Sequence, residues 1–340
     1  SEITFERNHA AFETLAEDSA HALRDRLESY KRSLDGGAGL FAASETVSLD
    51  EWRTYVDELD IERTLPGING IGYIEPIGLG DVASFEARMQ LQGVPEFAVH
   101  PDTPSPDVFA ITFIEPLAPN RKALGLNIAF EDNRRNGAAA ARDTGKATIT
   151  KRIFLVQDST RSAGFLLLRP LYRNGARLDS VAARRQAFRG WIYAPFISNR
   201  FLGELTSSQG TNLHLTVYDG KVADGDQLIF SSKAGDSTAA PAAYKITKVI
   251  SAMEQRWTVV WESTPAFEAS VTRGEPLLVL LGGIVLSALF GALQISYVRR
   301  EASIRRTVAL KTREIAAREH ENRSIVDTAV VAIILLDRNG

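Results

Sequence analysis

The sequence contains no cysteine, and it also lacks the short motifs that most catalytic sites require. Without thiols, disulfides, thiol chemistry and cysteine-ligated zinc sites are excluded. The five histidines lie on separate predicted elements without metal-ligand spacing. No phosphate-binding glycine loop or nucleophile elbow occurs, and His100, Asp102 and Ser105 share one loop. We therefore expect no catalytic residue, metal site or cofactor here, and any enzyme activity would belong to a domain after residue 340.

The chain also lacks a strong excess of either charge. Its 340 residues carry a formal net charge of −3, so the basic footprint of a nucleic-acid-binding protein is missing. The apolar fraction of 44% and the charged fraction of 24% are typical of a globular protein. The length predicts two or three domains, and a core of this size needs no disulfides.

Residues 276–298 contain no charged residue, and Arg299 and Arg300 follow directly after them. A helix needs about 20 mainly apolar residues to cross a membrane. Basic residues concentrate on the cytoplasmic side, and residues 299–323 are rich in arginine. We predict a bacterial inner-membrane protein with residues 1–274 periplasmic or extracellular and residues 299–340 cytoplasmic. The alternative is a buried helix of a soluble protein.

Both ends of the sequence predict a longer protein. No signal peptide opens the chain, so export requires an upstream segment, most simply a first membrane helix. The last two residues, Asn339 and Gly340, form a turn pair that normally joins two strands.

The first part of the chain predicts one long helix over residues 3–45. Its apolar residues, among them Phe5, Phe12, Leu23 and Leu27, recur at helical spacing between charged ones. Such a stripe needs a packing partner, and a second copy of the helix is the partner that we predict. A short helix follows from Ser48, which with Glu51 forms a capping box.

From residue 66 onward, strand and helix patterns alternate. Strands are predicted at residues 67–77, 108–117, 123–130, 147–156 and 164–172, and helices at 81–93 and 131–146. A second strand set is expected to begin at residue 190. The predicted fold class is α+β, with a long helix and two mixed modules in series, residues 46–172 and 173–272. A transmembrane helix at 275–298 and a linker helix at 299–323 follow.

Five segments in order resemble the CHASE domain, the external sensor module of plant cytokinin receptors and many bacterial sensor proteins. They are residues 39–44, 66–73, 111–128, 139–150 and 164–172. The resemblance implies a stalk helix at residues 1–45, a membrane-distal PAS-like module and a membrane-proximal PAS-like module. Residues 324–340 resemble the start of a cytoplasmic PAS domain.

The resemblance implies a homodimeric inner-membrane receptor that binds an unknown small molecule in its distal module. The implied output is a histidine kinase of a two-component system, with a diguanylate cyclase or phosphodiesterase as the alternative. A protein-interaction and dimerisation module without a small-molecule ligand also stays open. The plant receptors hold adenine through an acid in the segment that corresponds to residues 117–120, where this chain has none.

Strand alternation and the resemblance together indicate the ligand-binding residues. Alternation places Phe109, Ile111 and Phe113 on one face of their strand, although such residues more often form core. Thr150 matches the family's pocket threonine, and Asn127 stands where the family commonly has Asp. The full predicted set is Tyr73, Phe109, Ile111, Phe113, Leu117, Leu126, Asn127, Thr150, Phe165 and Leu167.

Overall fold

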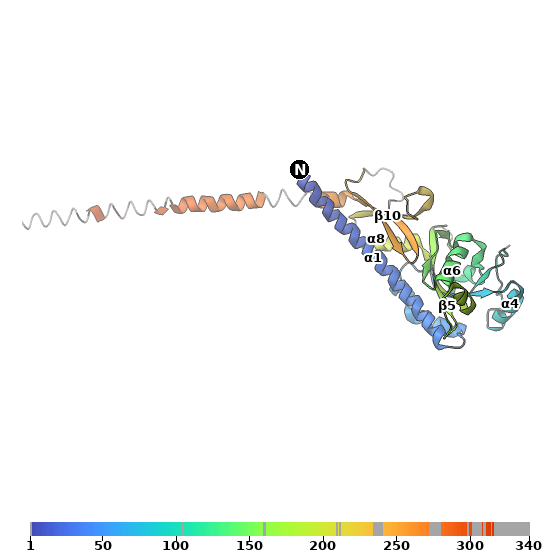
Figure 1. Ribbon diagram of the computed structural model, residues 1–340. Coiled ribbons are helices and arrows are strands. Elements are labelled where there is room, and N and C mark those ends of the chain that lie inside the picture. The colour runs from blue at the N-terminus through green and yellow to red at the C-terminus, as the bar shows by residue number, and fades with distance from the viewer. Residues whose placement is uncertain are drawn as a thin grey trace, which may run out of the picture. The chain divides into compact units, whose positions relative to one another are not determined.

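The computed structural model describes residues 2–103, 105–158, 161–208, 210, 212–233, 241–271, 280–297, 299–300, 308, 311–313 and 315. The chain forms two compact units, Ser1–Ala269 and Ser270–Gly340. The first unit combines helices with two antiparallel sheets (Figure 1). The predicted mixture of helix and sheet is therefore confirmed. Because both sheets belong to one compact unit, the division into two PAS-like modules stays a prediction.

The larger sheet has six strands in the order β2–β1–β6–β5–β3, and β4 pairs with β5. Strand β6 lies between β1 and β5, at the centre of this sheet. The prediction that residues 190–197 begin a second strand set is therefore wrong, because this strand forms its hydrogen bonds with the first set. The strands are β1 (Ile71–Ile77), β2 (Val108–Glu115), β3 (Thr148–Ile149), β4 (Ile153–Phe154), β5 (Ala163–Tyr172) and β6 (Phe188–Ile197).

The smaller sheet has four strands in the order β8–β7–β10–β9. Two backbone N–H groups tie the larger sheet to it. That of Ile149 donates to the carbonyl of Met253 over 3.2 Å, and that of Arg152 donates to the Asp219 carboxylate over 2.8 Å. The turn between β9 and β10 is therefore attached to strand β3. The strands are β7 (Leu213–Asp219), β8 (Leu228–Ser231), β9 (Lys245–Ala252) and β10 (Gln255–Ser263).

The long N-terminal helix is confirmed as α1 (Glu2–Ala43), which contacts β5, β6 and β9 and so runs along both sheets (Figure 1). Most of its apolar stripe is buried there, since Phe12, Leu23 and Leu27 are 0%, 1% and 1% exposed, whereas Phe5 near the start of the helix is 54% exposed. The prediction that a second copy covers this stripe is wrong, because the protein's own sheets already do so.

Helix α2 (Leu49–Leu59) packs against the end of α1. Gly36 and Gly37 of α1 make this approach possible. A Cβ on Gly36 would lie only 2.7 Å from the Tyr55 hydroxyl, and a Cβ on Gly37 would lie only 3.2 Å from the ring of Trp52. The predicted capping box is present, with the Ser48 side chain accepting from the Glu51 N–H and the Glu51 carboxylate accepting from the Ser48 N–H. Local sequence thus determines where this helix begins.

The remaining helices flank the sheets. Helix α6 (Asp132–Thr144) covers the face of the larger sheet opposite α1, and its buried alanines pack against β5 and β6. The others are α3 (Ile61–Thr64), α4 (Val82–Leu91), α5 (Leu117–Asn120), α7 (Val181–Ala187) and α8 (Ser198–Ser208), with 3-10 turns at Leu79–Asp81, Arg121–Ala123, Ile128–Phe130 and Gly225–Gln227.

The strand predicted at residues 123–130 is wrong. Two 3-10 turns flank a short link in which Leu126 and Asn127 form isolated bridges with His100 and Ala110. Gly125 adopts φ +78°, and a Cβ there would lie 2.1 Å from the carbonyl oxygen of Ala98. This turn of the backbone interrupts regular strand pairing.

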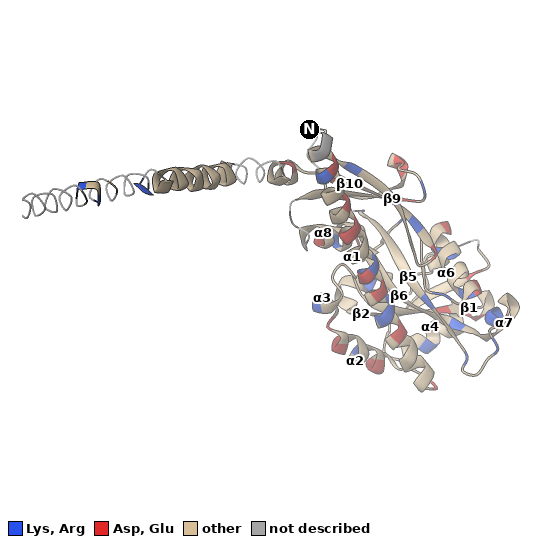
Figure 2. Ribbon diagram, turned by 60° about the vertical axis from the view of Figure 1, so that its left-hand side comes forward, with Lys and Arg blue, Asp and Glu red and all other residues tan. Residues whose placement is uncertain are grey.

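Among its described residues, the second unit contains one helix, Leu280–Tyr297, that is long and apolar enough to cross a membrane. Figure 2 shows no charged residue along it. This result agrees with the predicted transmembrane helix over the residues that the structure describes. The predicted linker helix at 299–323 falls mostly outside the described residues, and the predicted PAS segment at 324–340 falls wholly outside them.

Candidate functional site

The predicted ligand residues divide between the two faces of the larger sheet. Ile111 pairs with Ile74, whereas Phe113 pairs with Tyr73, and the register shifts between these pairs. Consecutive strand residues point to opposite faces, so their partners do as well. The prediction that Phe113 shares a face with Phe109 and Ile111 is wrong, because this β-bulge reverses the alternation.

On the face toward α6, the predicted residues form a closed apolar core. Phe109, Ile111 and Leu126 are at most 4% exposed and belong to one cluster with Trp191 and the alanines of α6. The ring of Phe109 lies 4.8 Å from that of Trp191. These residues supply the apolar wall of this face.

The two polar residues of the predicted set are buried, and the protein satisfies both. The Asn127 side-chain oxygen accepts from the N–H groups of Phe109 (2.9 Å) and Ala129 (3.1 Å). The Thr150 hydroxyl accepts from the Leu166 N–H over 3.0 Å. Both contacts hold the backbone beneath α6, so the structure gives these two side chains a local supporting role.

Four of the other predicted residues lie toward α1. Tyr73 and Phe113 lie together, with ring centres 6.0 Å apart. Phe165 packs into an aromatic cluster and lies 4.9 Å from Phe196, and Leu167 beside it on the same face is fully buried. Leu117 is half-buried at the start of α5, where its N–H donates to the Glu115 carboxylate.

A buried arginine and a buried tyrosine, neither of them predicted, stand out on the α6 face. Arg134 is 2% exposed and Tyr193 is 1% exposed. Among the residues that the structure describes, neither the Nε of Arg134 nor the hydroxyl of Tyr193 has a hydrogen-bond partner. Nearly all buried polar atoms in folded proteins do have one. We call these two side chains the orphan pair.

The charges around the orphan pair are only partly balanced. The Arg134 Nη2 donates to the Phe154 carbonyl over 2.6 Å, while its Nε lies 3.6 Å from the Glu131 carboxylate. Burial lowers the pKa of Arg134, although an arginine keeps its charge at neutral pH. Burial raises the pKa of the Tyr193 hydroxyl far above its ordinary value, against the opposing effect of the nearby guanidinium. The pair thus presents one cation and one neutral hydroxyl.

Helix α6 places Arg134 in this position. The Glu131 carboxylate caps the helix by accepting from the N–H groups of Asn133 (3.1 Å) and Arg134 (3.2 Å). Arg134 then falls on the same stripe as Gly137 and Ala138, which faces the sheet. The sequence signal that was missed is a charged residue on the apolar stripe of this helix.

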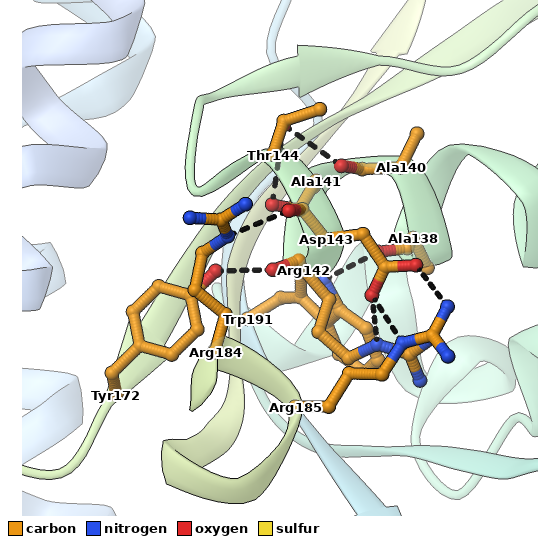
Figure 3. Close-up of polar contacts among 10 residues, drawn as sticks. All are labelled: Ala138, Ala140, Ala141, Arg142, Asp143, Thr144, Tyr172, Arg184, Arg185 and Trp191. Atoms are coloured by element: carbon orange, nitrogen blue, oxygen red, sulfur yellow. Dashed lines mark hydrogen bonds and ion pairs between the residues drawn. The ribbon is translucent and has the colours of Figure 1, made fainter. Parts of the chain in front are cut away.

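At the C-terminal end of α6, by contrast, the polar side chains have hydrogen-bond partners. The Asp143 carboxylate accepts from Arg142 (2.8 Å) and Arg185 (2.9 Å), and these guanidinium groups lower its pKa, with the hydrogen bond from Arg185 as the largest cause (Figure 3). The Tyr172 hydroxyl donates to the Arg142 carbonyl, and the Trp191 indole N–H donates to the Ala138 carbonyl over 3.0 Å (Figure 3). This end of the helix is firmly attached to β5, β6 and α7.

An open pocket lies on the α1 face of the same sheet. It has a volume of ≈ 250 Å³, and a neighbouring pocket of ≈ 390 Å³ shares Glu75 and Arg88 with it. We call the first one the α1-face pocket. Its lining comprises Phe41, Thr46, Val47, Tyr73, Glu75, Arg88, Gln92, Thr112, Phe113 and Arg189. Within the described part of the chain, no group of three His, Asp or Glu residues is arranged to hold a metal ion.

Comparison with known protein families matches more than half of the chain to one family model. Residues 45–230 match the family model of the CHASE domain. The chain is similar over 77% of its length to 94% of the periplasmic sensory domain of the Campylobacter jejuni chemoreceptor Tlp1, with 10% identity and a TM-score of 0.43. It is also similar over 74% of its length to 97% of the ligand-binding domain of the Pseudomonas aeruginosa amino acid chemoreceptor PctC in complex with GABA, with 11% identity and a TM-score of 0.39. No curated protein matches the chain.

Proposed function

This chain belongs to the CHASE domain family, and on that basis we propose that it is a membrane-anchored receptor for a small molecule outside the cytoplasm. The helix Leu280–Tyr297 supports a membrane anchor, and Arg299 and Arg300 after it support a cytoplasmic C-terminal side. The proposed output is a histidine kinase, with a diguanylate cyclase or phosphodiesterase as the alternative. Homodimerisation is retained from the family resemblance, with an interface other than the buried stripe of α1.

The orphan pair is the observation that carries the proposed ligand site. A buried donor without a partner costs about 1–3 kcal/mol, and more when it is charged. Both groups are donors, so a bound ligand that offers acceptor oxygens would remove this cost. A guanidinium prefers a carboxylate, which it binds through two parallel hydrogen bonds. Because both side chains are at most 2% exposed in the closed core, we propose that a carboxylate ligand binds between α6 and the larger sheet in a second state in which this core opens.

The proposed signal path leaves this site through the inter-sheet contacts. Thr150 lies beside Ile149, whose N–H is bonded to Met253 at the turn between β9 and β10. Strand β10 ends at Ser263, and residues 265–271 are helical. In the proposed scheme, the part with the larger sheet is the distal PAS-like module and the part with the smaller sheet is the proximal one. A ligand shifts such a system only through different affinities for its two states.

The experiment measures thermal unfolding of the full 340-residue chain in detergent micelles. The added compounds are a panel of mono- and dicarboxylic acids and amino acids. A binder at 100 times its dissociation constant stabilises the folded state by about 2.7 kcal/mol. We expect at least one compound to raise the melting temperature of the wild type and not that of Tyr193→Phe.

Tyr172→Phe is the matched control, because its hydroxyl is also at α6 but already donates to the Arg142 carbonyl. This variant should keep the full response to the ligand. A wild-type protein that responds to no member of the panel would contradict the carboxylate site, as would a response that Tyr193→Phe retains.

A further inference from the structure

The α1-face pocket lies on the other side of the sheet from the orphan pair, and its floor is aromatic. Phe41, Tyr73 and Phe113 are buried, and the ring of Tyr73 lies 4.6 Å from Phe41 and 6.0 Å from Phe113. Gly190 permits this arrangement, because a Cβ at that position would lie 2.6 Å from the Tyr73 ring. A floor of this kind suits a flat apolar molecule.

The rim of the pocket carries more positive than negative charge. Glu75 is paired with Arg88 at 2.7 Å, which leaves Arg189 as the excess cation. Among the described residues, Arg189 has no carboxylate partner. Its guanidinium donates only to the carbonyls of Phe41 and Glu45, each over 3.4 Å, and lies 5.9 Å from the centre of the Phe41 ring.

Such hydrogen bonds are long compared with the usual charge-assisted distance of about 2.7–2.9 Å. A carboxylate in the pocket would offer Arg189 shorter bonds and would balance the charge of the rim. The two adjoining hollows, ≈ 250 Å³ and ≈ 390 Å³, together reach the usual size of small-molecule sites, about 300–1,000 Å³. Because the carboxylate of Asp81 lines the second hollow, the carboxylate of a ligand belongs in the first one, beside Arg189.

We propose that the α1-face pocket is a second binding site, which takes a small carboxylate with a flat apolar body. Its lining joins the end of α1 at Phe41 and the following loop at Thr46 and Val47 to strands β1 and β2. An occupant therefore contacts both the long helix and the sheet. Binding holds these two parts together, and the site modulates the receptor independently of the ligand under α6.

The test uses benzoate as the probe and saturation-transfer NMR on the full chain in micelles. Benzoate should bind, and benzamide, which has the same shape without the charge, should bind about tenfold more weakly or worse. Arg189→Met should weaken benzoate binding by about tenfold or more. Val47→Phe fills the pocket without touching the contacts of Arg189, and should have an effect of at least the same size.

Arg173→Met is the matched control, because Arg173 is an exposed arginine that donates to the Gln186 carbonyl over 2.8 Å and does not line the pocket. It should change the dissociation constant by less than about twofold. Equal binding of benzamide and benzoate, unchanged binding in Arg189→Met and Val47→Phe, or no benzoate signal would each overturn the second site.

The two sites are separated by the variant Tyr193→Phe, which should leave benzoate binding unchanged. If Tyr193→Phe abolishes benzoate binding while Arg189→Met does not, benzoate occupies the site under α6. That outcome overturns the second site and leaves the proposed receptor function intact.

Discussion

Helix α6 is held differently at its two ends. Toward its C-terminus, Asp143 and the Arg142 carbonyl have partners on α7 and β5, and at its middle the Ala138 carbonyl accepts from Trp191 of β6 (Figure 3). Toward its N-terminus, the buried Nε of Arg134 and the buried hydroxyl of Tyr193 have no hydrogen-bond partner in the described part of the chain, although the Nε lies 3.6 Å from the Glu131 carboxylate. Both ends cover the same sheet, but they differ in the pairing of their polar groups and in burial, since the Asp143 side chain is 22% exposed and Arg134 is 2% exposed.

This contrast separates the part of the helix whose polar groups are paired from the part where the proposed ligand would pair them. Satisfied buried groups rigidify a structure, whereas an unsatisfied buried group destabilises it. Removing an unpaired buried group at the N-terminal end of α6 should therefore stabilise the folded state, and removing a paired group toward the C-terminal end should destabilise it. Substitutions at the two ends should differ in sign.

The largest expected effect breaks the attached end. Trp191 is fully buried between Phe109 and Phe188, whose rings lie 4.8 Å and 4.4 Å away, and it donates to the Ala138 carbonyl. Trp191→Ala should lower the free energy of unfolding by about 3–5 kcal/mol. The measurement is urea denaturation followed by circular dichroism.

Trp52→Ala provides the control for Trp191→Ala. Trp52 is equally buried, but it lies between α1 and α2 and not under α6. We expect a similar loss of stability with the response to the carboxylate ligand preserved, whereas Trp191→Ala should lose both. A loss of less than about 1 kcal/mol for Trp191→Ala would show that this tryptophan does not hold α6.

A smaller effect depends on pH. Arg185 and Arg142 hold the pKa of Asp143 below its ordinary value. A depressed pKa means that this stabilisation is complete above the unfolded value of about 3.9 and is lost as the pH falls toward the folded value. Asp143→Asn should cost about 1–2 kcal/mol at pH 7, and its difference from the wild type should shrink below about pH 4.

Asp179→Asn is the matched control for the acid-dependent contribution. Asp179 pairs with Arg177, but the two side chains are 56% and 86% exposed, so the pair should contribute less than about 1 kcal/mol. If Asp143→Asn and Asp179→Asn have equal effects across the pH range, the C-terminal end of α6 owes no special stability to its carboxylate.

Local signals in the sequence were sufficient for much of the fold. The long helix, the capping box at Ser48 and the strands at β1, β2 and β5 follow from periodicity and capping, which involve neighbours in the chain. The position of β6 did not follow, because its pairing with β1 joins residues far apart in sequence. The β-bulge between Ile111 and Phe113 could not be predicted from the sequence either, because it depends on how this strand pairs with β1.

The candidate site was predicted only in part for the same reason. The sequence placed apolar residues such as Phe109 and Leu126 under α6, and it showed Arg134 on the stripe with Ala138. It did not show that Tyr193 would lie near Arg134, or that the Glu131 carboxylate would stay 3.6 Å from the Arg134 Nε, beyond hydrogen-bond distance. Whether a buried charge is paired depends on tertiary contacts, which a single sequence does not contain.

The smallest predicted effect compares the two ends of α6 most directly. The same substitution, Tyr to Phe, is made at Tyr172 on β5 and at Tyr193 on β6, which lie against the two ends of the helix. Tyr172→Phe removes a hydroxyl that donates to the Arg142 carbonyl, and burial raises the pKa of Tyr172 to about 12, so it stays neutral. It should lose about 1 kcal/mol of unfolding free energy. Tyr193→Phe removes a buried hydroxyl without a partner and should gain about 1 kcal/mol in the absence of ligand. Paired thermal melts measure both changes, and a loss at both positions would mean that the Tyr193 hydroxyl is already satisfied and that α6 has no unpaired end.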